Sequence, residues 1–357
     1  MRKKKRDIFE GRKVYELTEE ENTAVITKEV AEACRHRLEK RWYRRLVEIN
    51  FLMIIVVVVM LVVNMENNTA LAEQAVEQFQ EEFREVMSDA TVADEETDET
   101  ADGGGAEAVG EAGGNTDGKS DEKDSRVKLT VEDIPLEVKG LFYGIALLIV
   151  VYLGLYYYYA AYRANSLRIT EKNFPEIYAL IEDYARRLGI KTPKAYVMQQ
   201  NGVLNAFSAF LFRKQWICIH TELFEVAYRE HKDMDALSFV IAHEMAHIYY
   251  GHATLHYNLL IWFSRLIPPF SAIASRAREY SCDRLAQRLT GTDGLDAMLV
   301  LVVDRHLYKL VDKEDYVEEM RKQKGFFIWV VNMFADHPLM CKRVAALADG
   351  KGSGKLY

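Results

Sequence analysis

The stretch that decides the fold is Phe239-Val240-Ile241-Ala242-His243-Glu244-Met245-Ala246-His247-Ile248. His243 and His247 are four residues apart, so on an α-helix both imidazoles lie on one face, one turn apart. This H-E-x-x-H pattern is typical of zinc proteases, in which two histidines bind the metal and the Glu, here Glu244, takes a proton from water. The same pattern also arises by chance on core helices, so the interpretation needs a third ligand elsewhere in the chain.

Two positions are candidates for that ligand. His252 is nine residues from His243, about 180° round a straight helix, so we predict a partly exposed side chain near the helix end. The longer motif H-E-x-x-H-x-x-G-x-x-H needs a histidine at position 253, which is Ala253. Glu279 is the better candidate, because a His₂Glu shell is an established catalytic arrangement and Asp283 shares its helical face. The alternative is a surface helix whose acids pair with nearby arginines: Arg276, Arg278 and Arg284.

Together these residues resemble peptidase family M48, the group of HtpX-like and Ste24-like membrane metallopeptidases. The matching motifs are His243-Glu244-x-x-His247, Glu279-x-x-x-Asp283, His337-Pro338 with Arg343 and Leu347 following, and Asn205-Ala206-Phe207. The resemblance covers roughly residues 165–350. It implies an α+β, minigluzincin-like catalytic domain that is mainly helical, with a small antiparallel sheet.

The resemblance also implies a role for each of these residues. His243, His247 and Glu279 would bind one Zn²⁺ per chain, Glu244 would be the general base, and Asp283 would orient a ligating histidine. Asn205, Ala206 and Phe207 would form an edge strand along which an extended polypeptide substrate lies. His337 and Arg343 would bind substrate or stabilise the oxyanion. Alternatively, His337-Pro338 is only a turn before a helix at Leu339–Ala348.

The chain departs from the M48 pattern at two places. Cys282 stands where these proteases usually have a small residue, and we predict a small buried thiol, the alternative being a fourth, soft metal ligand. Leu255–Ile273, where the family often has further membrane spans, contains an arginine and a Pro-Pro pair. We expect a soluble helix there, or a hairpin that dips into the membrane face, rather than a third span.

Two apolar runs divide the chain. Residues 46–65 and 140–162 are the predicted transmembrane helices. Six Lys/Arg precede the first run between Arg35 and Arg45, so the positive-inside rule places the N-terminus in the cytoplasm. We therefore expect a multi-pass protein of the cell membrane, in contact with the lipid bilayer. The basic segment 1–45 and the peptidase domain 163–357 would be cytoplasmic, and the loop 66–139 extracytoplasmic.

Charge is unevenly distributed around these spans. The net charge is −8, yet residues 66–139 contain 22 Asp/Glu and 6 Lys/Arg, a local charge of −16. In that loop the apolar spacing over Met65–Ala90 predicts an amphipathic helix, which either packs on the protein or forms a stalk for a homo-oligomer. Asp94–Ser125 is predicted to be a disordered linker. The basic helix from about Val25 to Glu48 is expected to be solvated, or to contact anionic lipid.

The peptidase domain is predicted to begin with a helix and three strands. The helix is Phe174–Leu188, and the strands Ala195–Gln199, Leu204–Phe212 and Gln215–His220 are joined by turns at Asn201-Gly202 and Arg213-Lys214. From Thr221 a helical period runs through the zinc-binding stretch. The chain has no basic patch with interleaved aromatic residues, which excludes nucleic acid as a partner. Its four irregularly spaced cysteines indicate a reducing compartment.

These observations predict a membrane-bound zinc metalloendopeptidase that hydrolyses peptide bonds in membrane or misfolded proteins, as part of protein quality control. The rival interpretation is a non-enzymatic, membrane-anchored binding or regulatory protein with a structural zinc site. A structural site would need a fourth protein ligand, and the sequence offers no good candidate.

Overall fold

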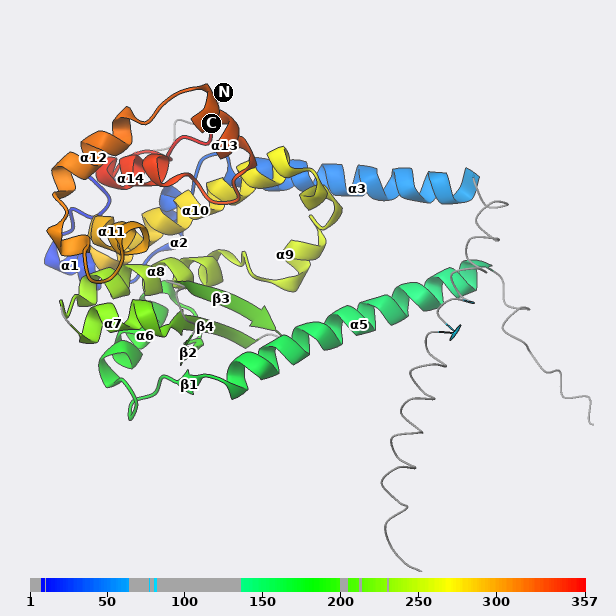
Figure 1. Cartoon of the computed structure of the whole chain (residues 1–357), viewed down its shortest axis with the longest axis horizontal. Helices are drawn as coiled ribbons and strands as arrows, with labels where there is room; N and C mark the ends of the chain where they lie inside the picture. The colour runs from blue at the N-terminus through cyan, green and yellow to red at the C-terminus, as the bar shows by residue number, and fades with distance from the viewer. Residues whose placement is uncertain are drawn as a thin grey trace, which may run out of the picture. The chain divides into compact units, whose positions relative to one another are not determined.

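The computed structural model describes residues 8–9, 11–63, 77, 80–81, 136–199, 205–211, 214–229 and 231–357. Apart from the isolated positions 77, 80 and 81, the predicted helix Met65–Ala90 lies outside this range, as do the predicted linker Asp94–Ser125 and the turn Asn201-Gly202. The described part is mainly helical with a small mixed sheet, which confirms the α+β class (Figure 1). It forms two units: residues 1–56 with 152–357, and residues 57–151.

The sheet has four strands within the described residues, in the order β1-β2-β4-β3. They are β1 (Leu167–Arg168), β2 (Lys194–Met198), β3 (Ala206–Leu211) and β4 (Lys214–His220). β3 and β4 form an antiparallel hairpin, but β2 pairs with β4 in parallel, so the prediction of an antiparallel sheet is wrong. Burial explains the order, because Ile217, Cys218 and Ile219 are fully buried, which favours the centre of the sheet for β4 and leaves β3 at the edge.

Helix α8 (Met234–Tyr250) packs between the sheet and helix α10 (Pro268–Thr290) (Figure 1). The side chain of Asp233 caps its start by accepting a hydrogen bond of 3.0 Å from the backbone N–H of Ala236. Gly251, in the left-handed conformation, ends it. Twelve of its 17 residues are buried, so it is a core helix contacted on several sides. Its other neighbours are α6 (Pro175–Leu188), α7 (Thr221–Tyr228) and α11 (Leu295–Val303).

Short elements surround this core in the second half of the chain. Helix α9 (Leu255–Leu259) and the 3-10 helix η2 (Phe263–Leu266) precede α10, so Leu255–Ile273 forms no continuous span. After α11 come the 3-10 helix η3 (Tyr308–Leu310) and the helices α12 (Lys313–Lys322), α13 (Phe326–Phe334) and α14 (Met340–Asp349). α13 and α14 contact α10, which brings the C-terminal part of the chain to the site.

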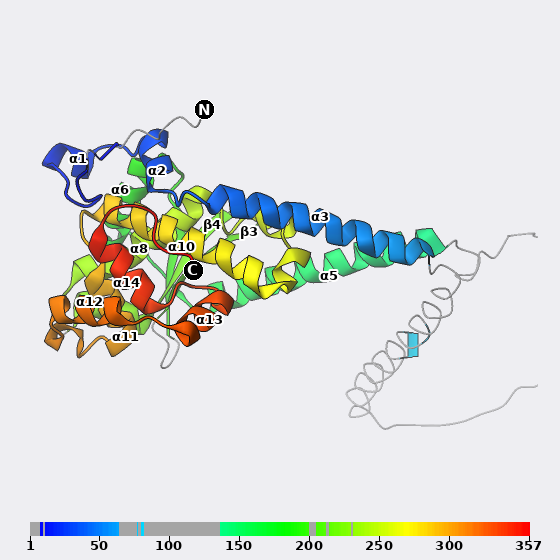
Figure 2. The same cartoon turned by 90° about the horizontal axis from the view of Figure 1, so that it is seen from above.

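The N-terminal segment packs into the body of the protein. It forms α1 (Glu19–Thr23), α2 (Lys28–Cys34) and α3 (Glu39–Val63), and α1 and α2 contact α10 (Figure 2). The prediction of one solvated helix from about Val25 to Glu48 is therefore wrong. The backbone N–H of His36 donates to the hydroxyl of Ser281 at 2.8 Å, a tertiary contact that lies at the break between α2 and α3. Ile26, Ala31 and Cys34 are buried in the main hydrophobic cluster.

Helix α5 (Leu136–Ala164) contains the one stretch of the described residues, Phe142–Ala164, that is long and apolar enough to cross a membrane. It coincides with the second predicted span. Helix α3 covers the first predicted span as far as Val63, the last residue described there. Length and composition alone support the second span, and both spans stay predictions.

A close contact beside α8 gives a test of the packing. Gly294 has a φ of +78°, and a Cβ at this position would lie 2.3 Å from Cε2 of Phe239 in α8. Gly294→Ala should lower the free energy of unfolding by about 1–3 kcal/mol, because the ring has to move and the backbone is strained. Thermal unfolding of the full chain in detergent measures this loss.

The matched control is Gly352→Ala. Gly352 has a φ of +72°, and its added Cβ would meet no atom within 4 Å. It therefore carries the backbone strain without the clash. Equal unfolding temperatures for the two variants would contradict the contact with Phe239.

Candidate active site

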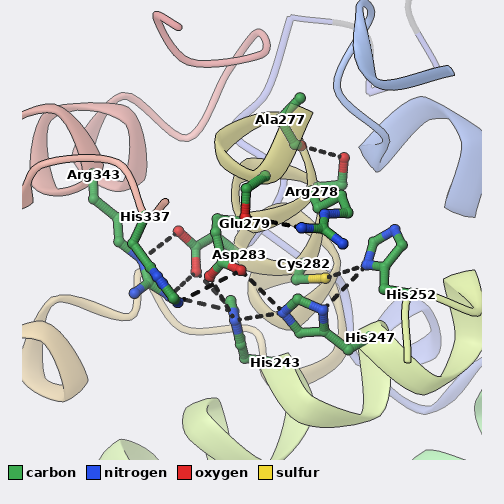
Figure 3. Close-up of polar contacts among 12 residues, drawn as sticks. His243, His247, His252, Ala277, Arg278, Glu279, Cys282, Asp283, His337 and Arg343 are labelled. Carbon is green, nitrogen blue, oxygen red and sulfur yellow. Dashed lines mark hydrogen bonds and ion pairs between the residues drawn. The ribbon is translucent and has the colours of Figure 1, made fainter. Parts of the chain in front are cut away.

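Three potential metal ligands meet where α8 packs on α10. His243 and His247 project from α8 toward Glu279 on α10 (Figure 3). The two Nε2 atoms are 3.2 Å apart, and the carboxylate oxygens of Glu279 lie 3.3 Å from Nε2 of His243 and 3.4 Å from Nε2 of His247. Ligand atoms at about 2.0–2.1 Å from a tetrahedral zinc ion are about 3.3 Å from one another. These three side chains, the ligand group, therefore fit one zinc ion.

The outer nitrogen of His243 is held by a carboxylate. Its Nδ1 lies 2.9 Å from Oδ1 of Asp283, and Arg343 on α14 donates two hydrogen bonds to the same carboxylate, at 2.7 and 2.6 Å. Burial opposes ionisation of Asp283, but the Arg343 guanidinium and the His243 imidazole lower the pKa of Asp283 to about 2. The ionised carboxylate accepts the N–H of Nδ1 and leaves Nε2 of His243 directed at the ligand group.

The ligand group is itself electrostatically coupled. Burial opposes ionisation of Glu279, yet the imidazoles of His247 and His243 hold the pKa of Glu279 well below its usual value. Burial also disfavours the imidazolium of His243, but hydrogen bonds to Asp283 and Glu279 raise the pKa of His243 to about 9. In the metal-free protein a proton on Nε2 of His243 thus partly balances the buried carboxylates.

His252 lies beside the ligand group, contrary to the prediction of a partly exposed side chain. It is only 4% exposed, and its Nδ1 lies 3.2 Å from Nδ1 of His247. The prediction fails because Gly251 ends α8 and the backbone N–H of His252 bonds to the carbonyl oxygen of His247. Burial lowers the pKa of His252 to about 4, so its imidazole is neutral at physiological pH. Its other nitrogen, Nε2, lies 3.2 Å from Oε1 of Glu39 in α3, a residue that sequence reasoning missed altogether.

Cys282 is buried, as predicted, and lies near His252. Its Sγ is 3.6 Å from Nδ1 of His252, and burial raises the pKa of the thiol well above its usual value. Cys282, His252 and His247 form a second group of potential ligands, next to the first. A metal ion bound by Cys282 would have to displace the proton of this thiol.

A cleft of about 680 Å³ opens onto the ligand group. Glu244 lines it, as do Asn205, Ala206 and Phe207, and β3 is an edge strand of the described sheet. His337 also lines it, with a side chain that is 69% exposed and an Nε2 that lies 4.0 Å from Oε1 of Glu279. The structure therefore brings the predicted site residues together. Asp283 lies against His243. The other nine line this cleft: His243, Glu244, His247, Glu279, His337, Arg343, Asn205, Ala206 and Phe207.

Comparison with known proteins identifies a family. The model of a family described as peptidase family M48 matches residues 171–261 and 254–350, which together span half of the 357-residue chain. The matched range includes the ligand group, Asp283, His337 and Arg343. No curated protein and no solved structure matches the chain.

The raised pKa of His243 predicts that zinc binding releases a proton. At pH 8 an imidazole with a pKa of about 9 is about 90% protonated, whereas one with the ordinary pKa of about 6.5 is about 3% protonated. Zinc binding at pH 8 should therefore release close to one proton from His243. Calorimetric titration in buffers of different ionisation enthalpy measures the release.

Asp283→Asn is the comparison variant, because it removes the carboxylate charge that faces His243. Its proton release at pH 8 should fall well below that of the wild type. A binding enthalpy of the wild type that does not change with the buffer would contradict the prediction.

Proposed function

The chain belongs to peptidase family M48, a family of metallopeptidases, and we propose that it is a minigluzincin-type zinc endopeptidase that cleaves polypeptides at a membrane. The observation that carries the proposal is the close approach of three ligand side chains. The Nε2 atoms of His243 and His247 are 3.2 Å apart, and each lies 3.3–3.4 Å from one carboxylate oxygen of Glu279. These side chains lie in the wall of a cleft of about 680 Å³, within the size range of ligand-binding pockets.

Zinc, on which M48 peptidases typically depend, would be held by these three residues. When bound, it would polarise the peptide carbonyl and lower the pKa of a water molecule. Asp283 fixes the tautomer of His243 so that Nε2 faces His247 and Glu279 and would be free to bind the metal. Because two nitrogens of Arg343 donate to Asp283, we assign Arg343 to the positioning of Asp283 rather than to the oxyanion.

Glu244 is the proposed general base. It directly follows His243 on α8 and lines the same cleft. Its carboxylate accepts a proton from the attacking water and passes it to the nitrogen of the leaving amine. His337, an exposed residue that lines the cleft near Glu279, would donate a hydrogen bond to the substrate carbonyl oxygen as negative charge develops there.

The edge strand β3 is the proposed substrate-binding surface. Residues Asn205, Ala206 and Phe207 lie at its start and line the cleft, and β4 pairs with only one of its two edges. An extended polypeptide can pair with the other edge through backbone hydrogen bonds, independently of its side chains. This mode of binding suits an endopeptidase with broad specificity.

Membrane anchoring is part of the proposal. Many large apolar side chains of α5 are exposed, which favours an apolar surrounding for this helix. With the predicted first span at 46–65, the charge distribution favours residues 1–45 and 163–357 in the cytoplasm and the loop 66–139 outside. Tethering raises the local concentration of membrane-bound substrates, so we propose membrane or misfolded proteins as substrates and quality control as the role.

Glu244→Gln tests the enzymatic function. The amide cannot accept the proton, so cleavage of casein or of a membrane protein substrate should fall by at least about 100-fold. Zinc content, measured by elemental analysis, should stay near one per chain because Glu244 is not a ligand. Glu314→Gln, an exposed substitution at the start of α12, is the matched control and should keep wild-type activity.

Chelation supplies the complementary measurement. Removal of the metal should abolish cleavage by the wild type, and added zinc should restore it. A structural zinc site would be favoured by two results together. The zinc-loaded wild-type chain would cleave neither substrate, and the Glu244→Gln variant would behave like the wild type in cells.

A further inference from the structure

The outer nitrogen of the second histidine of the ligand group meets an imidazole rather than a carboxylate. Nδ1 of His247 lies 3.2 Å from Nδ1 of His252 (Figure 3), and Nε2 of His252 lies 3.2 Å from Oε1 of Glu39. His252 and Glu39 are both buried. The carboxylate of Glu39 is held in place by Nε of Arg35 at 3.4 Å and by a contact with the hydroxyl of Ser281.

The backbone after α8 makes this contact possible. Gly251 has a φ of +75°, and the backbone N–H of His252 bonds to the carbonyl oxygen of His247 at 3.1 Å. The imidazole of His252 therefore lies against the last turn of α8. On an uninterrupted helix it would be about 140° round the axis from His247 and unable to reach it.

One arrangement of protons satisfies the two contacts. An ionised carboxylate only accepts hydrogen bonds, so Nε2 of His252 carries the N–H that bonds to Glu39. A neutral imidazole then has a lone pair at Nδ1, which accepts a hydrogen bond from Nδ1–H of His247. This protonation of His247 leaves a lone pair on its Nε2, on the side of His243 and Glu279.

We propose that Glu39 and His252 form a positioning pair that fixes the tautomer and ring orientation of His247 for metal binding. The proposal rests on the zinc site described above. Both histidines of the ligand group are then oriented by a carboxylate: His243 directly by Asp283, and His247 by Glu39 through His252. Orientation of this kind tunes metal affinity in zinc sites.

Glu39 comes from a distant part of the chain. It is the first residue of α3, more than 200 residues from His252 and outside the range 171–350 matched by the family. The N-terminal segment thus takes part in the proposed metal site, although it precedes the peptidase domain.

The competing interpretation is a second metal ion bound by His247, His252 and Cys282. Such an ion would need lone pairs on Nδ1 of both histidines and a thiolate at Cys282. His247 would have to lose both ring protons if its Nε2 also bound zinc, which is unfavourable at neutral pH. The number of zinc ions per chain separates a second site from the hydrogen-bonded pair.

Zinc affinity of the full chain in detergent, measured by competition with a fluorescent chelator, tests the pair. His252→Phe keeps a ring but removes both nitrogens, and the affinity should fall about 10–100-fold, the usual cost of losing such a partner. His252→Gln offers an amide oxygen to His247 and an amide N–H to Glu39, and should recover most of the affinity. Glu39→Gln removes the negative charge that sets the tautomer of His252. The zinc affinity of this variant should lie between those of His252→Phe and His252→Gln.

Two controls separate positioning from general damage. Glu48→Gln on the same helix and His256→Phe on α9 alter exposed residues of the same types and should keep wild-type zinc affinity. Thermal unfolding of the metal-free variants shows whether they fold. At saturating zinc, KM for a peptide should be unchanged in Glu39→Gln, since Glu39 does not line the cleft.

The outcomes distinguish the pair from the proposed function. Wild-type zinc affinity in His252→Phe, or equal losses in His252→Phe and His252→Gln, would overturn the pair and leave the zinc peptidase intact. Two zinc ions per chain, one of them lost in Cys282→Ala, would also overturn it. If His252→Phe does not fold, the zinc affinities of Glu39→Gln and Glu48→Gln are compared instead. Equal zinc affinities of these two variants would overturn the positioning pair. A wild-type chain that binds no zinc would overturn both proposals.

Discussion

Two buried carboxylates between α8 and α10 are the constraint on which the site depends. Glu279 and Asp283 are removed from water, which costs several kcal/mol for each unless cations or hydrogen-bond donors face them. Arg343 faces Asp283, and the imidazoles of the ligand group face Glu279. In the metal-free protein the proton on His243 completes this balance. A cation bound by the ligand group would replace the positive charge that the His243 proton supplies.

The spacing of residues within helices was sufficient to predict much of this arrangement. Pairs four residues apart on two helices, His243 with His247 and Glu279 with Asp283, converge once the helices pack, because helix geometry fixes which side chains share a face. Prediction failed where tertiary packing decides. The parallel pairing of β2 with β4 depends on which strand is most deeply buried, and the position of His252 depends on the turn at Gly251. Gly251 was sufficient to predict the end of α8, but it does not predict the direction in which the side chain of His252 points.

The packing of the N-terminal segment could not be predicted from the sequence. Its many basic residues suggested solvent or lipid contact, yet Ile26, Ala31 and Cys34 are part of the main core. Glu39 is buried against α10 through Ser281, a contact between residues 242 positions apart. Long-range pairs of this kind leave no periodicity in the sequence. The segment that precedes the first predicted span is therefore also part of the packed body that holds the site.

The edge position of β3 has a consequence for which proteins would be attacked. A strand that pairs with a substrate through backbone groups requires that the substrate's own N–H and C=O groups are unpaired. In a folded protein those groups are already hydrogen-bonded in helices and sheets. A native chain could therefore not bind along β3 until one of its segments unfolds locally. Selection would then depend on how often each candidate unfolds locally, and a protease with little side-chain preference would still spare its well-folded neighbours.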